Sequence, residues 1–104
     1  MRYRATILPR AECDEAEIYD YLAQHSAAVT QRFIDQVSET IQKLCSISTP
    51  GLPWPSENPR LADLRWTKVT AFPNHLVFFP VVEDSIEVVR ILHGARDLEA
   101  IFRD

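Results

Sequence analysis

Glycine, cysteine and long apolar runs are all scarce in this sequence. Two of the 104 residues are glycine and two are cysteine, which leaves no material for a glycine-rich phosphate-binding loop or a disulfide framework. No apolar run approaches the ~20 residues of a membrane-spanning helix, and the opening residues lack the apolar core of a signal peptide. We therefore expect a cytoplasmic protein in which Cys13 and Cys45 are free thiols buried in helices.

Basic residues are outnumbered by acidic ones. The chain has 11 lysines and arginines against 15 aspartates and glutamates, for a formal net charge of −4. A dedicated nucleic-acid-binding domain usually has the reverse balance, because neutralised phosphates supply most of its affinity. Direct nucleic-acid binding is therefore disfavoured. The length and the ordinary share of hydrophobic residues, 46%, predict one globular domain over residues 1–104.

The residues that commonly bind metal ions are scattered along the chain. His25, His75 and His93 are far apart in sequence, and Cys13 and Cys45 are not spaced as a C-x-x-C pair. Neither pattern suits a zinc site, which needs ligands at close, regular spacing. We expect no metal and no cofactor.

The first half of the chain predicts a strand and two helices. Residues 2–8 alternate between the two faces of a strand, and Pro9 ends it. Residues 10–25 form an acid-rich helix with Ala11, Ile18 and Leu22 on one face and Glu15 interrupting it. A second helix follows the capping residue Ser26. Its apolar face consists of Val29, Phe33, Ile34, Val37, Ile41, Leu44 and Cys45. The short connection predicts a helical hairpin.

The second half predicts a loop and three strands. Residues 46–60 contain four of the seven prolines, so they form a loop in which Gly51 is free to take a positive φ and Trp54 anchors the loop to the body. Strands are expected at 64–70, 75–82 and 85–93, joined by short hairpins, with a bulge or an unpaired edge at Pro80. A short helix ends the chain.

These elements predict an α+β fold in the order β-α-α-β-β-β with a short C-terminal helix. The helical hairpin covers one face of a small, mainly antiparallel sheet. In the last strand, Ile86, Val88 and Leu92 are expected on one face and Val89 and Ile91 on the other, so both faces are apolar. The face without helices is predicted to be open and to bind an extended or helical peptide of a partner.

Basic residues of the second half are predicted to gather on one face of the sheet. The set is Arg65, Lys68, His75, Arg90, His93 and Arg96. Such a cluster could hold a scissile phosphate, with one group as base and arginines stabilising the developing charge. In the alternative interpretation, which we favour, Arg90 and Arg96 are structural and pair with Asp84, Asp97 and Glu99.

Several motifs in order along the chain resemble the RelE/ParE superfamily of toxins from type II toxin–antitoxin modules. They are Ala11, Asp14, Ile18 and Tyr21 at fixed spacing, Arg32-Phe33, Pro50-Gly51, the strand LVFF and the block RILHGARDL. Glu15 departs from the leucine usual after that aspartate. The resemblance implies the fold described above, a cognate ParD-like antitoxin in a hetero-oligomeric complex, and a role in growth inhibition and plasmid stabilisation.

Within the superfamily, the resemblance is closer to ParE-like toxins, which poison DNA gyrase, than to RelE-like ribosome-dependent mRNA endonucleases. The positions of the RelE-like catalytic residues hold Trp66, Lys68, His75, Arg96 and Phe102. Only Lys68 and Arg96 keep the expected residue type, and Phe102 has no hydroxyl group. A nuclease would use Lys68, His75 and Arg96.

We therefore expect no catalytic residue and a contact surface for antitoxin or target. Its predicted members are Trp66, Lys68, His75, Arg90, His93, Arg96 and Phe102. A degenerate, non-toxic family member is a third possibility.

Overall fold

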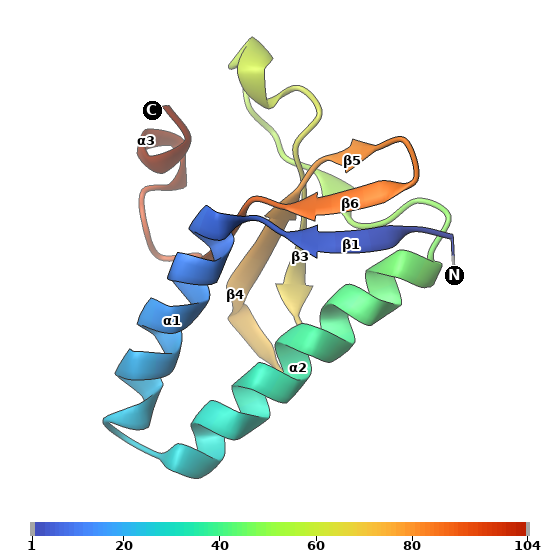
Figure 1. Ribbon diagram of the computed structural model, residues 1–104. Coiled ribbons are helices and arrows are strands. Elements are labelled where there is room, and N and C mark those ends of the chain that lie inside the picture. Colours follow the sequence, from blue (N-terminus) through green and yellow to red (C-terminus); the bar gives the residue numbers. More distant parts are fainter. Residues whose placement is uncertain (1, 104) are drawn as a thin grey trace.

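Two long helices pack on one face of a strongly curved sheet in the computed structural model, which describes residues 2–103 (Figure 1). The elements in chain order are β1 (Arg4–Ile7), α1 (Pro9–Ala23), α2 (Ala27–Ser46), β2 (Leu52–Pro53), the 3-10 helix η1 (Pro59–Leu61), β3 (Arg65–Val69), β4 (Phe72–Phe79), β5 (Val81–Val82), β6 (Ser85–Val88), β7 (Arg90–His93) and α3 (Leu98–Arg103). The predicted α+β architecture is confirmed. None of the helices in residues 2–103 is long and apolar enough to cross a membrane.

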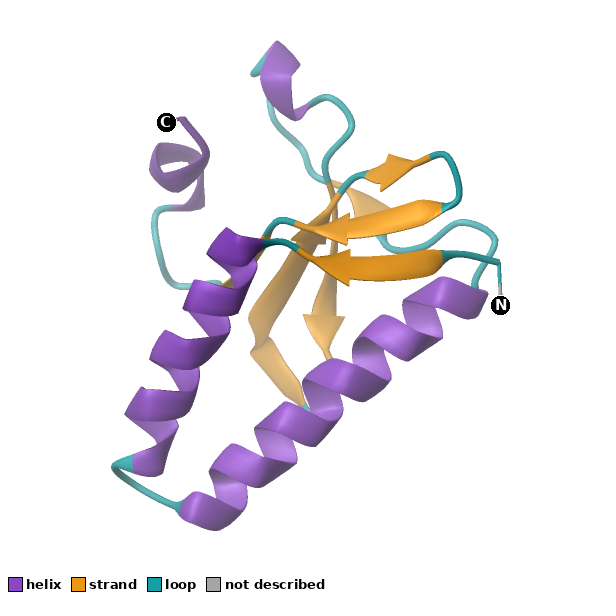
Figure 2. Ribbon diagram, viewed as in Figure 1, coloured by secondary structure: helices purple, strands orange, loops and turns teal. Residues whose placement is uncertain are grey.

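The helical hairpin forms as predicted (Figure 2). α1 begins at Pro9, whose fixed φ suits a first helical position. The Ser26 Oγ caps α2 by accepting a hydrogen bond from the Val29 N–H at 3.1 Å. The predicted α2 face is buried except for Ile34, which is partly buried, and Val29, which is exposed near the start of the helix. Cys13 was expected to be buried and is exposed, because it lies two residues, about 200° around the helix, from the buried Ala11.

Two hydrogen-bonded strand groups make up the sheet, in the orders β1-β6-β5 and β2-β3-β4-β7. β1 is parallel to β6, and every other pair is antiparallel. The predicted strands 75–82 and 85–93 are each broken once, at Pro80 and at Val89. The hairpin continues across the breaks, because the Glu87 N–H donates to the Pro80 carbonyl and the Val89 N–H to the Phe78 carbonyl.

The break at Val89 reverses the alternation of side chains along the last strand. Ile86, Val88 and Ile91 lie in one core, whereas Val89 and Leu92 lie in the other. The predicted grouping of Leu92 with Ile86 and Val88 is therefore wrong. An extra residue at a bulge shifts every later side chain to the opposite face.

The sheet has a hydrophobic core on each face. The helix-side core consists of Ala11, Phe33, Val37, Ile41, Leu44, Cys45, Val69, Val77, Phe79, Ile86, Val88 and Ile91. The second core consists of Leu64, Leu76, Phe78, Leu92 and Leu98, with Trp54, Leu61, Trp66, Val89, Ile101 and Phe102 packed against it. The predicted open sheet face is therefore wrong. The proline-rich loop and α3 fold back over that face and leave Phe78 and Leu92 buried.

Gly51 allows the loop to turn toward the second face. Its φ is +66°, and a Cβ there would lie 2.6 Å from the Trp66 carbonyl oxygen and 2.8 Å from the Phe79 ring. Only glycine tolerates both the conformation and the contact. Trp54 then anchors the loop as predicted, with its ring edge-on to Phe78 at 5.2 Å between centroids.

Candidate functional site

A buried ion pair joins α1 to β7. The Arg90 Nε donates to the Asp14 Oδ2 at 2.7 Å and its Nη2 to the Oδ1 at 3.0 Å, while the Ile91 N–H also donates to Oδ2 at 3.0 Å. The Asp14 side chain is 2% exposed and that of Arg90 13%. A two-point arginine–carboxylate pair of this kind fixes both orientation and position. Arg90 is therefore held in place by the fold.

The acids predicted to pair with Arg90 and Arg96 have other partners. Asp84 pairs with Arg4 on the surface at 3.3 Å. Glu99 accepts hydrogen bonds from the Trp54 Nε1 at 3.2 Å and the Ser56 Oγ at 3.3 Å, which ties α3 to the proline-rich loop. The structural role expected for Arg90 is correct, but its predicted partners are wrong. Asp14 lies 76 residues away on a helix, and no local pattern links the two.

A cleft of about 830 Å³ opens beside the Asp14–Arg90 pair. It lies between the start of α1, η1 and the segment that leads into α3. Four arginines line it, Arg10, Arg60, Arg90 and Arg96. The rest of the wall is Leu8, Pro9, Leu61, Val89, Ile101 and Phe102. The cleft thus combines positive charge with an apolar surface, and it contains three of the predicted contact residues, Arg90, Arg96 and Phe102.

Two predicted residues, His75 and His93, lie elsewhere. They face each other across β4 and β7 with ring centroids 5.0 Å apart, and Phe33 of α2 packs edge-on against His75 at 4.8 Å. Burial, and secondarily the neighbouring His93, lower the pKa of His75. The His93 Nδ1 accepts a hydrogen bond from the Ala95 N–H at 3.0 Å, so neutral His93 carries its proton on Nε2.

The last two predicted residues, Trp66 and Lys68, lie on the opposite face of the sheet from the histidines. Their partners across β3 and β4 are Phe78 and Leu76, both of the second core. Trp66 packs edge-on to Trp54, and Lys68 is exposed. The predicted gathering of the basic residues on one face is therefore wrong. Neighbouring positions of a strand, such as His75 and Leu76, point to opposite faces.

Arg65 has a structural role at the edge of β3. Its Nε donates to the Pro50 carbonyl at 2.7 Å and its Nη2 to the Gly51 carbonyl at 2.9 Å. These bonds hold the loop at the point where it turns toward the second face. Within residues 2–103, no group of three or more histidine, cysteine, aspartate or glutamate side chains is placed to hold a metal ion.

Arg10 and Arg60 were missed in the sequence. They come from the start of α1 and from η1, and neither belongs to a motif. The return of the proline-rich loop across the sheet brings Arg60 to the cleft, and the packing of α1 against β7 brings Arg10 there. Asp14 was recognised only as part of a family pattern. Its burial was not predicted, because the apolar residues Ala11 and Ile18 on the same helix face do not indicate that a charged side chain between them is buried.

Comparisons with known proteins agree with this architecture. A family model described as the ParE toxin of the type II toxin–antitoxin system parDE matches residues 6–98. A solved structure titled as the chromosomal ParDE toxin–antitoxin system from P. aeruginosa superposes with a TM-score of 0.69 at 20% sequence identity. The match covers 88% of this chain and 96% of that one. No significant match is found among curated protein sequences. Because the family model spans most of the chain, this protein belongs to the ParE toxin family of type II toxin–antitoxin systems.

Proposed function

We propose that this chain is the toxin of a type II toxin–antitoxin module, which inhibits growth by poisoning DNA gyrase and is neutralised by a cognate antitoxin in a hetero-oligomeric complex. The observation that carries the proposal is the match of the ParE family model to residues 6–98. The fold supports it, since almost the whole of a chain from a ParDE complex superposes on this one.

The arrangement of the basic residues supports a toxin that acts by binding, not by hydrolysis. General acid–base catalysis requires the acid and the base within hydrogen-bond reach of one substrate. His75 lies on the helix side of the sheet, Lys68 lies on the other face, and Arg96 lines the cleft. An mRNA endonuclease built on these three residues would need them together, so this alternative is disfavoured.

The exposed members of the predicted contact set are the ones we propose for recognition. Arg90 is committed to Asp14, and Trp66 and Phe102 pack against the second core. Lys68, His93 and Arg96 are exposed. Lys68 lies on the second face and Arg96 lines the cleft, whereas His93 lies beside His75 on the helix side. All three are proposed to contact the antitoxin or the target.

The test in cells is induction of this chain alone, with DNA damage and message integrity followed separately. Gyrase poisoning predicts induction of the SOS response and cleaved chromosomal DNA while early messages stay intact. Early message cleavage with intact DNA would establish the nuclease instead. Unaffected growth would identify a non-toxic family member. Co-expression of the adjacent open reading frame tests for the antitoxin, which should restore growth.

Purified gyrase provides the direct test. With protein from cell-free synthesis, we expect linear plasmid DNA to accumulate in the presence of gyrase and ATP, and not when gyrase is omitted. Arg96→Glu tests the assigned contact. Arg2→Glu is the charge-matched control, because Arg2 is exposed and lies by the N-terminus, on the opposite side of the molecule from α3 (Figure 1). Gyrase poisoning that survives Arg96→Glu in a folded protein would remove Arg96 from the contact set.

A further inference from the structure

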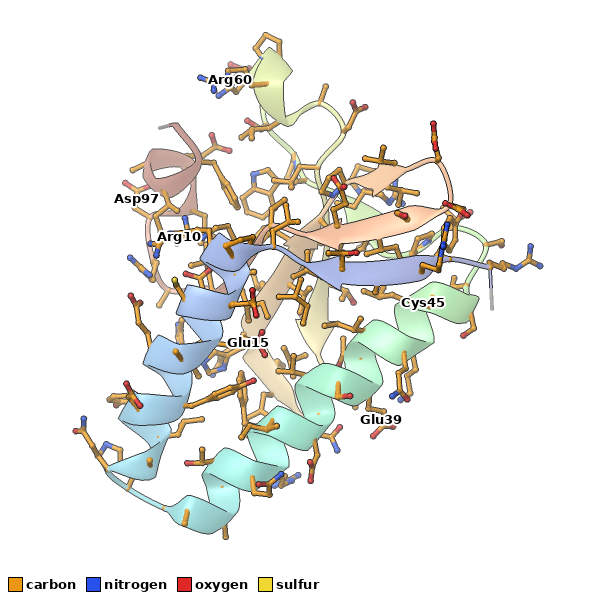
Figure 3. The ribbon with its side chains drawn as sticks, in the orientation of Figure 1. Arg10, Glu15, Glu39, Cys45, Arg60 and Asp97 are labelled. Carbon is orange, nitrogen blue, oxygen red and sulfur yellow. The ribbon has the colours of Figure 1, made fainter. Side chains whose placement is uncertain are left out.

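Among the described residues, three of the four cleft arginines have no acidic partner. The ion pairs among the side chains of residues 2–102 are Arg4–Asp84, Lys43–Glu39 and Arg90–Asp14. Arg10, Arg60 and Arg96 are exposed and belong to none of them. In Figure 3, Arg10 is labelled at the first turn of α1 and Arg60 on η1, on two sides of the space next to α3. Three separate segments of an acidic chain thus bring to one cleft positive charge that no described acidic side chain neutralises.

The start of α1 adds to the positive potential. Pro9 occupies the first turn, and the N-cap residue Leu8 has no side chain that could accept a hydrogen bond from the helix. The first N–H groups of α1 therefore have no side-chain cap at the edge of the cleft, and Glu12 in the first turn offsets only part of the positive end of the helix dipole. A carboxylate bound near Arg10 would gain from both the guanidinium group and this helix end.

The apolar part of the cleft requires that the ligand also carry apolar side chains. Leu61, Val89 and Phe102 are only partly buried against the second core and present their remaining surface to the cleft. The volume, about 830 Å³, lies within the range of clefts that bind drug-sized ligands. This space suits a short peptide segment with two or three bulky side chains.

We propose that the cleft binds an acidic peptide segment from a partner protein, with carboxylates paired to Arg10, Arg60 and Arg96 and with aliphatic or aromatic side chains against Leu61, Val89 and Phe102. The segment is complementary in both charge and polarity. A partner surface of this chemistry can belong to an antitoxin or to a target, so the proposal goes beyond the proposed function and does not rest on gyrase.

A peptide fits this cleft better than a nucleic acid does. A nucleic-acid strand is bound by a basic track with free aromatic faces on which bases stack. Here the protein carries a net charge of −4. The ring of Phe102 is packed edge-on against Phe78 at 4.9 Å, so it is held in the second core. A phosphodiester backbone would not bury the apolar wall of the cleft favourably, whereas leucine or phenylalanine side chains would.

Selection of displayed peptides tests this proposal. The full chain, made by cell-free synthesis, is immobilised and used to select from a library of random 12-residue peptides. We expect enrichment of sequences that combine aspartate or glutamate with leucine, isoleucine or phenylalanine. The variant with Arg10→Gln, Arg60→Gln and Arg96→Gln should not enrich them, whereas Arg2→Gln should. The three replaced side chains are exposed and form no ion pair with the side chains of residues 2–102, so circular dichroism and thermal unfolding should confirm that the variant folds.

Fluorescence anisotropy with the enriched peptide gives the magnitudes. Each arginine replaced should weaken binding by about 5-fold and the triple variant by about 100-fold, and binding should weaken further at high salt. Single-stranded DNA and RNA of the same length serve as competing probes.

Three results would overturn the proposal: no enriched peptide, enriched peptides without acidic residues, or peptide affinity unchanged in the triple variant. A nucleic-acid strand that binds more tightly than the peptide, and loses affinity in the triple variant, would assign the cleft to nucleic acid. None of these outcomes affects the gyrase cleavage assay, so the two proposals can fail separately.

Discussion

The helix-side core is covered by helices of 15 and 20 residues, whereas the second core is covered by a proline-rich loop and a helix of six residues. A six-residue helix is too short to be stable in water by itself, so α3 depends on the packing of its own apolar side chains. The two faces therefore differ in how their covers are maintained. The first is covered by long, cooperative helices, and the second by short segments that depend on packing against the sheet and against each other.

The polar contacts of the two faces differ in the same way. On the helix side, the Asp14–Arg90 pair is buried and made at two points. On the other face, the Glu99 contacts with Trp54 and Ser56 are exposed. Exposed hydrogen bonds and few buried contacts are typical of segments that open locally before the whole protein unfolds. The arginine-lined cleft lies at the edge of this less protected region.

The largest expected effect is in the helix-side core. Phe33 is fully buried and packs edge-on against Tyr19, Phe72 and His75. Phe33→Ala should lower the free energy of unfolding by about 3–5 kcal/mol, measured by urea denaturation. Phe102→Ala, in the partly buried cover of the second core, is the matched control and should cost clearly less. Equal losses would contradict the proposed difference between the two faces.

The buried ion pair is expected to rank next. Asp14→Asn leaves the Arg90 guanidinium buried without an opposite charge, which should cost about 3 kcal/mol. Asp84→Asn, in the exposed pair with Arg4, should cost less than about 0.5 kcal/mol. Both values come from urea denaturation at neutral pH. If the two variants were equally stable, the Asp14–Arg90 pair would not be the structural link between α1 and β7 that its geometry indicates.

A smaller and local effect is expected for α3. Leu98 is buried in the second core, and Leu98→Ala should lower the local stability of α3 and the loop by about 2 kcal/mol. Amide hydrogen exchange should become faster in residues 98–102 and 54–64 and stay unchanged in α2. Leu44→Ala, on the helix side, is the comparison and should accelerate exchange across the sheet. A global response to Leu98→Ala would mean that the two cores unfold together.

The sequence predicted the helix side better than the second face. Three-and-four spacing identified the buried residues of α2, and Ser26 identified its start, because both signals are local. The cover of the second face depends on contacts across the chain, such as Glu99 with Trp54, 45 residues apart. Proline content indicated a loop but not its direction, so the face was predicted to be open.

The candidate site was predicted only in part, for two physical reasons. The bulge at Val89 changes which side chains share a face, and nothing in a run of apolar residues marks the extra position. The Asp14–Arg90 pair and the cleft of Arg10, Arg60 and Arg96 join residues that are distant in sequence. Single residues of the right type, such as Arg96, were recognised, but the set to which they belong was not.

The smallest expected effect is the pH dependence that comes from His75 at the edge of the helix-side core. Burial, and then the neighbouring His93, lower the pKa of His75 in the folded protein, while the unfolded chain keeps a value near 6.5. Above that value both states are neutral at His75, and stability does not change. As the pH falls below it, the unfolded chain takes up the proton first, so the free energy of unfolding decreases. His75→Gln should flatten this decrease below about pH 6.5 in urea denaturation. His25→Gln removes an exposed imidazole outside both cores and is the control. If the free energies of unfolding of the wild-type protein and the His75→Gln variant changed in parallel with pH, folding would not lower the pKa of His75.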